Sequence, residues 1–150
     1  MSETVEAPRI EWPSAAPEAM KAMMALEKAV AAKVDRKLFH LIKLRVSQMN
    51  GCAYCIAMHV KEALRDGEQI LRLTLLDAWR ESHLYDERER AVLEWTEAVT
   101  RIADSHAPRE IYDRLAALFS AEEVANLTLA ATAINAWNRI AISGRSRHAD

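Results

Sequence analysis

Two cysteines and one histidine are the side chains in this sequence best suited to chemistry, and they fall within eight residues. Cys55 and His59 lie four residues apart and share a helix face, and Cys52 lies seven residues before His59 on that face. Near a helix start, free N–H groups and the helix dipole stabilise a thiolate. A neutral His59 can accept the thiol proton of Cys55, directly or through water. The pattern indicates a nucleophilic thiol beside a base.

The same two cysteines are spaced to form a disulfide. They are the only cysteines of the 150 residues, and they fall within the first turn of the expected helix. Two such thiols can close into a disulfide once one of them has been oxidised. In a reducing cytosol, this kind of pair is more typical of catalysis or metal binding than of a structural cross-link. We therefore expect a reversible intramolecular disulfide between Cys52 and Cys55.

Other interpretations of the cysteines stay open at this point. His40, Cys52, Cys55 and His59 offer two sulfur and two nitrogen ligands, a set that tetrahedral zinc accepts, although the order is not that of a zinc finger. The alternative function is a zinc-binding or redox-sensing interaction protein that uses these four residues. Two inert core cysteines are the plainest alternative. A haem attachment site is excluded because Ile56, not histidine, follows the second cysteine.

The composition predicts one folded, all-α domain. Apolar residues make up 51% of the chain, which argues against disorder, and only 3 Gly and 4 Pro argue against a turn-rich β-sandwich. Charges nearly balance, with 20 Lys and Arg against 22 Asp and Glu, so we expect no nucleic-acid partner and no attraction to anionic membranes. We expect no bound cofactor and no resident metal.

Apolar spacings near three and four residues predict a single-domain bundle of six or seven helices. Residues 1–16 are expected to form an extended leader, with Ser14 capping the first helix and Pro17 in its first turn. The helical domain then spans residues 17–150. Capping residues that mark later helix starts are Asp35, Asp86 with Glu89, and Ser120 with Glu123, and Gly67 is expected to end the helix that begins near Cys52.

The ends and surfaces of the chain suggest where it works. The N-terminus has no basic and apolar regions of a secretory signal, and the apolar stretch 127–142 is interrupted by Asn135, Asn138 and Arg139. We expect a cytoplasmic protein that does not enter a membrane. Four Trp and six Met in so short a chain predict a homo-oligomer with an apolar helical interface.

The segment Leu41-Ile-Lys-Leu-Arg-Val-Ser-Gln-Met-Asn-Gly-Cys-Ala-Tyr-Cys-Ile-Ala-Met-His59 closely resembles the signature of AhpD-like alkylhydroperoxidases, which belong to the carboxymuconolactone decarboxylase family. The stretches from Tyr85 to Thr100 and from Leu127 to Ile140 are similar to the same family. The resemblance covers roughly residues 17–145. It implies an all-α fold and a homo-oligomer, commonly a trimer or hexamer.

The resemblance also implies an activity: reduction of alkyl hydroperoxides by the dithiol, recycled by a thiol reductant such as a dihydrolipoamide-type donor. It assigns Cys55 as the thiol that attacks the peroxide, Cys52 as its disulfide partner and contact for the reductant, and His59 as the histidine of the proton relay. The family's relay glutamate corresponds to position 40, which is His40 here. A neutral imidazole can accept a proton but supplies no fixed negative charge. The intact dithiol argues against the lactone decarboxylase activity of the other branch.

Overall fold

The structure is a computed structural model that describes residues 6–149, and within that range it contains helices and no strand. The elements in chain order are α1 (Trp12–Ala15), α2 (Pro17–Ala31), α3 (Arg36–Asn50), α4 (Ala53–Arg65), α5 (Ile70–Thr74), the 3₁₀ helix η1 (Leu75–Ala78), α6 (Glu87–Thr100), α7 (Ile102–Ser105), α8 (Arg109–Ala116) and α9 (Ala121–Ser143). The expected all-α bundle is confirmed. The described helices outnumber the six or seven expected because two single-turn helices, α1 and α7, carry too few residues to show a periodic pattern.

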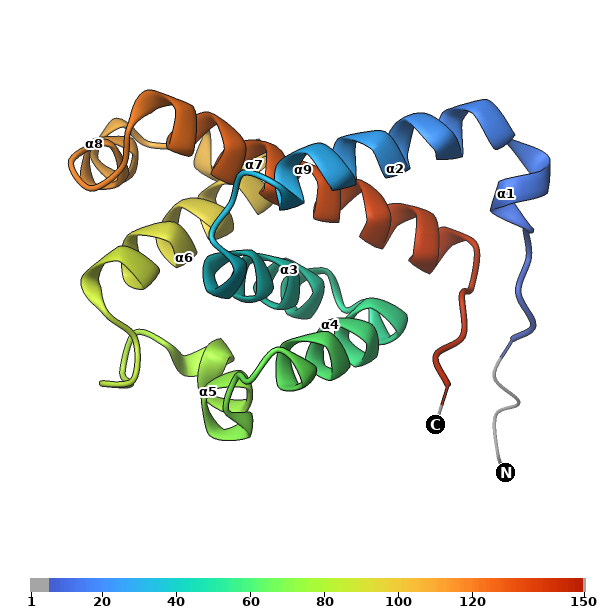
Figure 1. The fold of residues 1–150 in the computed structure, drawn as a ribbon, viewed down its shortest axis with the longest axis horizontal. Coiled ribbons are helices and arrows are strands. Elements are labelled where there is room, and N and C mark those ends of the chain that lie inside the picture. The colour runs from blue at the N-terminus through green and yellow to red at the C-terminus, as the bar shows by residue number, and fades with distance from the viewer. Residues whose placement is uncertain (1–5, 150) are drawn as a thin grey trace.

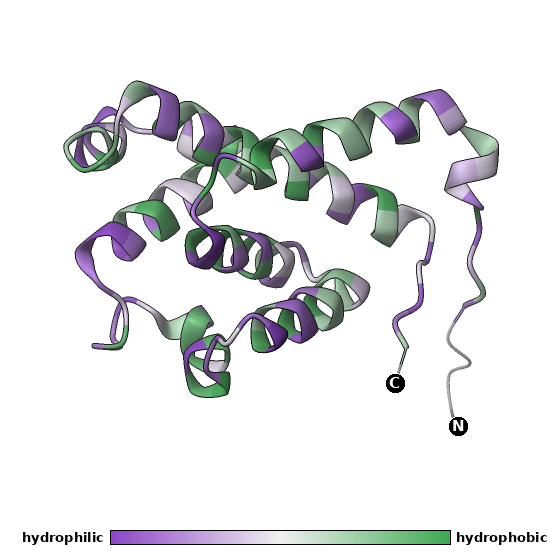
Figure 2. Ribbon diagram, in the orientation of Figure 1, coloured by the Kyte–Doolittle hydropathy of each residue, from purple (hydrophilic) through white to green (hydrophobic). Residues whose placement is uncertain are grey.

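α3 lies at the centre of the molecule and packs against α4, α6 and α9 (Figure 1). Its expected inner stripe is buried at Leu38, Leu41, Ile42 and Val46. Figure 2 shows hydrophilic residues among the hydrophobic ones along this helix, although it is enclosed on several sides. Buried charges on α3 must therefore find partners inside the protein.

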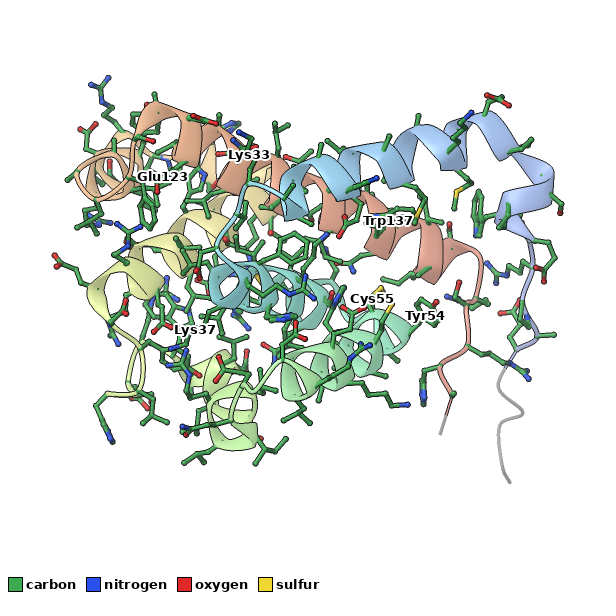
Figure 3. All side chains as sticks on the ribbon, viewed as in Figure 1. Lys33, Lys37, Tyr54, Cys55, Glu123 and Trp137 are labelled. Atoms are coloured by element: carbon green, nitrogen blue, oxygen red, sulfur yellow. A yellow bond between two sulfur atoms is a disulfide. The ribbon has the colours of Figure 1, made fainter. Side chains whose placement is uncertain are left out.

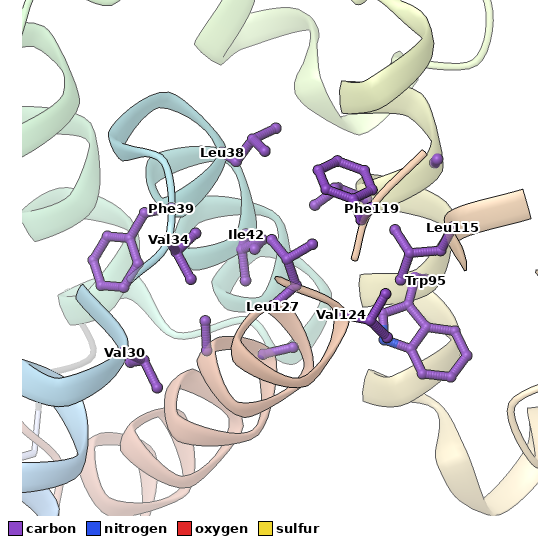
Figure 4. Close-up of a cluster of buried hydrophobic side chains, with 14 of the residues drawn as sticks. Val30, Val34, Leu38, Phe39, Ile42, Trp95, Leu115, Phe119, Val124 and Leu127 are labelled. Atoms are coloured by element: carbon purple, nitrogen blue, oxygen red, sulfur yellow. The ribbon is translucent and has the colours of Figure 1, made fainter. Parts of the chain in front are cut away.

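Two groups of apolar side chains on different faces of α3 hold the bundle together. The larger joins α2, α3, α6, α8 and α9, and Figure 4 shows Trp95, Leu115 and Phe119 meeting Leu127 within it. The smaller joins α3 and α4 to the α5–η1 segment through Leu44, Leu73, Leu76 and Trp79, among others. The two groups thus hold α3 in place from both sides. They also fix the position of α4, which follows α3 and packs against it.

The segment before α2 differs from the extended leader that we expected. Residues Trp12–Ala15 form a helical turn, and Ser14 lies inside it instead of capping α2. α2 begins at Pro17 after Ala16, without a side-chain cap, so proline does occupy the first turn as expected. The segment before α1 lies beside the segment that follows α9 (Figure 1), and the Arg9 N–H donates to the Gly144 carbonyl at 2.8 Å.

The helix boundaries around the cysteines follow the expected local signals. The Asp35 side chain accepts from the N–H groups of Lys37 and Leu38 at the start of α3. α3 ends at Gly51, whose φ of 67° is the left-handed conformation that glycine adopts most easily. Cys52 is the N-cap of α4, as its position near the helix start predicted. No helix of residues 6–149 is both long and apolar enough to cross a membrane.

Candidate functional site

Cys52 and Cys55 form a disulfide, which confirms that the pair can close as the spacing predicted. Their Cα atoms lie 5.3 Å apart at the start of α4. The Cys55 N–H donates to the Cys52 sulfur at 3.3 Å, within the cap of the helix. Both residues are almost completely buried, with exposed fractions of 1% and 2%, and Ala141 of α9 packs against them. Any molecule that reacts with this disulfide must therefore enter a cavity of the protein that reaches the buried sulfur atoms.

A network of amide and hydroxyl groups fixes the turn that leads into the disulfide. The Asn50 side chain donates to Asn135 at 3.0 Å and to Asn138 at 2.9 Å, and Asn138 in turn donates to the Ser47 hydroxyl at 3.1 Å. These bonds tie the end of α3 to α9. Ser47 and Asn50 belong to the signature segment, but their partners lie more than 80 residues away, so local spacing does not predict these bonds.

A cavity of about 390 Å³ opens beside the disulfide, between the α1–α2 segment, α4 and α9. We call it the dithiol cavity. Most of its wall is apolar, and the main contributors are Met20, Met24, Met58, Ile134, Trp137 and Ile140. Of the two cysteines, only Cys55 contributes to the wall. Figure 3 shows the yellow disulfide near the start of α4, with Tyr54 beside it and Trp137 on the neighbouring α9. Tyr54 also lines the cavity.

His59 lines the same cavity and is held by the carboxylate of Glu62, which with Glu94 and Glu97 is one of the sequence's alternatives to His40 for the start of the relay. His59 Nδ1 lies 3.2 Å from an oxygen of Glu62, three residues further along α4. An ionised carboxylate can only accept, so Nδ1 carries the proton and a neutral ring presents Nε2 as a lone pair. That Nε2 atom is buried and has no hydrogen-bond partner among the described residues. The ring is set up to accept a proton from a thiol that enters its reach.

The electrostatics favour the ionised form of Glu62. The hydrogen bond from His59 lowers the pKa of this carboxyl below its ordinary value, although its partial burial acts in the opposite direction. The positive charges that His59, His40 and Arg65 can carry add smaller contributions in the lowering direction. The signal in the sequence was the spacing of three residues between His59 and Glu62, which places both on one helix face.

His40 is buried near this group but is not hydrogen-bonded to His59 in the described structure. Its Nε2 donates to Asp66 at 2.7 Å, and Asp66 also accepts from Arg36 at 2.6 Å. His40 Nδ1 is buried without a partner among residues 6–149. The structure thus brings Cys52, Cys55 and His59 together, and places His40 against Asp66 instead of His59.

A buried ion pair between α2 and α3 lies at the wall of the dithiol cavity. Lys43 is fully buried on α3, and its Nζ lies 2.5 Å from the carboxylate of Glu27 on α2. The Trp137 indole N–H donates to the same carboxylate at 3.0 Å. Burial lowers the pKa of Lys43, while the Glu27 carboxylate favours its charged form. Glu27, but not Lys43, contributes to the cavity wall.

The zinc interpretation has no support in this geometry. No group of three or more His, Cys, Asp or Glu side chains within the described part of the chain is arranged to hold a metal ion. Zinc binds thiolates, and in this state both sulfurs are joined to each other.

Comparisons with known proteins show the family of this chain. The model of the carboxymuconolactone decarboxylase family matches residues 17–98. The uncharacterized protein YdfG of Bacillus subtilis strain 168 is 42% identical over 142 residues, which cover 94% of this chain and 97% of that protein.

Solved crystal structures share the fold, and two of them serve as examples. ATU0492 of Agrobacterium tumefaciens is a protein of unknown function that is described as a putative antioxidant defence protein AhpD. It is 48% identical to this chain, and the two structures superpose with a TM-score of 0.93 over 96% of this chain and 99% of that one. An uncharacterized peroxidase-related protein of Ralstonia eutropha JMP134 with an alkylhydroperoxidase AhpD core has a TM-score of 0.80 at 19% identity, covering 92% and 74% of the two chains. This second likeness concerns the fold alone. The chain therefore belongs to the carboxymuconolactone decarboxylase family and is one of its AhpD-like members.

Proposed function

We propose that this protein is a thiol-dependent peroxidase that reduces alkyl hydroperoxides with the Cys52–Cys55 dithiol. The observation that carries the proposal is the disulfide at the wall of an apolar cavity, with the unpartnered Nε2 of His59 in the same wall. A buried thiol pair that closes into a disulfide can accept and release two electrons without any metal or cofactor. The likeness to AhpD-type proteins supports the same activity.

In the proposed oxidation, His59 takes the thiol proton of Cys55 and the resulting thiolate attacks the terminal oxygen of the hydroperoxide. The O–O bond breaks, and the alkoxide that leaves takes the proton back from His59 to become an alcohol. Cys55 is left as a sulfenic acid. The Cys52 thiol then attacks the Cys55 sulfur, which forms the disulfide and releases water. An external dithiol, such as a dihydrolipoamide-type donor, restores the two thiols.

We propose that Glu62 supplies the fixed negative charge of this relay. Its carboxylate accepts from His59 Nδ1, so it holds the ring in the tautomer that leaves Nε2 free and stabilises the imidazolium formed during the reaction. Position 40 carries histidine where the family carries the relay glutamate. His40 then has an indirect role, because its Nε2 is bonded to Asp66 and it makes no hydrogen bond to His59 within the described residues.

Peroxide turnover with a panel of thiol donors tests the proposal. Wild type is expected to consume alkyl hydroperoxide continuously, Cys55→Ser is expected to be inactive, and Cys52→Ser is expected to react once and stop at a sulfenic acid that dimedone traps. Equal turnover by wild type and Cys55→Ser would contradict the proposal. Oxidation of the thiols without sustained turnover would instead identify a redox sensor, and stoichiometric zinc in the freshly purified protein would support the metal-binding alternative.

A further inference from the structure

The ionisable groups in the wall of the dithiol cavity carry charge of one sign. Glu27 and Glu62 both contribute to the wall, and no Lys or Arg among the described residues does so. His59 and Tyr54 also line the cavity, and the Nδ1 proton of His59 is already donated to Glu62. A ligand in this cavity therefore meets two carboxylates and no free cation.

The cation that pairs with Glu27 lies behind the wall. Lys43 is only 1% exposed, and its ammonium contacts Glu27 from the protein side. The Trp137 indole N–H is also donated to Glu27, so it is not available to a ligand. The cavity side of the Glu27–Lys43 pair is its negative end. A ligand carboxylate placed there would face like charge in a poorly solvated site, where such repulsion is screened much less than at the surface.

Both reaction partners must use this cavity to reach sulfur. Cys52 and Cys55 are buried to within 2% of their surface, and of the two only Cys55 contributes to the cavity wall. Oxidant and reductant therefore meet the same apolar wall of methionine, isoleucine and tryptophan side chains. A cavity of about 390 Å³ lies within the roughly 300–1,000 Å³ range of small-molecule sites.

We infer that the dithiol cavity selects uncharged, apolar molecules in both halves of the cycle and discriminates against those that carry a carboxylate, with Glu27 as the specificity-determining residue. The inference rests on the proposed function. In the reductive half, a thiolate of the donor attacks the Cys55 sulfur, because Cys55 and not Cys52 lines the cavity, whereas the family resemblance assigns the reductant contact to Cys52. The Cys52–Cys55 bond breaks, which gives a mixed disulfide on Cys55, and Cys52 takes up a proton to become a thiol. The second donor thiol displaces Cys55, so the donor leaves as a cyclic disulfide, oxidised by two electrons, and both cysteines are thiols.

Dihydrolipoamide and dihydrolipoate form a matched pair of probes for this half, because they carry the same dithiol and differ in one remote carboxylate. The rate at which each donor reduces the Cys52–Cys55 disulfide is measured, and the dihydrolipoamide rate is divided by the dihydrolipoate rate. This ratio is then divided by the corresponding ratio of rates for a small-molecule disulfide in free solution, which corrects for the intrinsic reactivity of the two donors. We expect dihydrolipoamide to be about tenfold faster after this correction, as befits a close like-charge encounter in a partly buried site. A corrected ratio near one would overturn the inference.

The oxidative half is tested with cumene hydroperoxide and its para-carboxylate derivative, and the expected preference for the neutral peroxide is again about tenfold. If neither peroxide oxidises the dithiol, the proposed function fails while the reductant ratio still decides the inference. If both peroxides react at equal rates, the proposed function stands and the inference fails.

A double variant assigns the selection to Glu27. Glu27→Gln alone would leave Lys43 buried without its partner, so Lys43→Met is added to remove both charges together, a change that proteins often tolerate. We expect the reductant ratio to fall to about threefold, because Glu62 remains. The matched control is Glu94→Gln, whose carboxylate pairs with Arg114 on the surface. A ratio that stays at tenfold in the double variant would overturn the assignment to Glu27. If the double variant does not fold, the wild-type ratios alone decide whether the cavity selects by charge.

Discussion

At the scale of single residues, the chemistry depends on which atom of His59 is free. Its Nδ1 is committed to Glu62, and its Nε2 is buried without a partner in the described structure. The carboxylate stands three residues after the histidine, whereas the family's relay carboxylate is expected at position 40. The tautomer of His59 is therefore set within α4 itself, by neighbours on one helix face.

Glu62→Gln is expected to slow peroxide-driven disulfide formation by about 10²-fold, the low end of the effect of acid–base assistance. Glutamine keeps a hydrogen-bond acceptor for His59 but removes the charge that stabilises the imidazolium. His40→Ala is expected to slow the reaction less, because the Nε2 atom of His40 is bonded to Asp66 and not to His59. Stopped-flow measurement of thiol loss compares the variants.

The matched control for the loss of a carboxylate is Glu110→Gln on the exposed face of α8. A His40→Ala rate as low as that of Glu62→Gln would contradict the ranking and return His40 to the centre of the relay.

At the scale of elements, the site is built at the junction of α3 and α4. Gly51 ends α3 in the left-handed conformation, and the next residue, Cys52, caps α4. The hydrogen bonds from Asn50 to α9 hold this junction in place. The position of the disulfide against the cavity thus depends on a two-residue turn between two helices.

Gly51→Ala is expected to lower the free energy of unfolding by about 1 kcal/mol, because an L-residue with a side chain is strained at a φ of 67°. Apart from Gly51 and its two chain neighbours, no atom of residues 6–149 lies within 4 Å of the position that a Cβ would take, so the cost comes from the backbone alone. Urea denaturation measures it. Gly51→Asn is the matched control, since asparagine tolerates this conformation better. Equal losses in the two variants would show that backbone strain is not the cause.

At the scale of the whole molecule, acid is expected to destabilise the fold through its partly buried carboxylates. Burial raises the pKa of Glu97, but hydrogen bonds from Trp79, Arg80 and Arg45 outweigh it and leave the pKa below its ordinary value. The pKa of Glu62 is also lowered, first by its hydrogen bond with His59. Each carboxylate contributes stability that is fully present above its unfolded pKa and is lost as the pH falls through the lower folded pKa.

Thermal unfolding followed by circular dichroism is expected to give a Tm that changes little from pH 7 to about pH 5 and drops below about pH 4.5. Glu97→Gln removes one carboxylate partner of Arg45 and leaves Asp77 as the other, so it is expected to cost about 2 kcal/mol at neutral pH and to flatten the acid drop. An unchanged acid drop in this variant would show that other groups control acid unfolding.

The whole molecule also bears on the expected homo-oligomer. Trp79 and Trp95 are buried in the core, and Trp12 and Trp137 line the dithiol cavity, so the tryptophans are not themselves the argument for an interface. Large aliphatic side chains are instead exposed at Ile70, Leu71, Ile102 and Leu129, among others. Exposed apolar surface of this kind favours association. Light scattering is expected to give a multiple of 16.9 kDa, and the monomer mass at working concentration would rule the oligomer out.

The sequence by itself determined the features that depend on neighbours a few residues apart. The caps at Asp35, Asp86 and Ser120, the left-handed Gly67 and the Cys52–Cys55 pair all appear where the pattern predicted them. Capping and helix-face spacing are local, so a short window contains both partners of each interaction. The Glu62–His59 contact is local too, and its spacing of three residues was a signal that was available in the sequence.

Only the tertiary structure decided what surrounds the disulfide. The Glu27–Trp137 hydrogen bond joins residues 110 apart, and the cavity wall combines three segments that meet only after folding. Lys43 is buried because α3 is enclosed by α4, α6 and α9. Its ammonium pairs with the carboxylate of Glu27 on α2. Long-range packing determines which charges face the cavity and which lie behind its wall. Helix periodicity reports only local spacing, so it does not predict this arrangement.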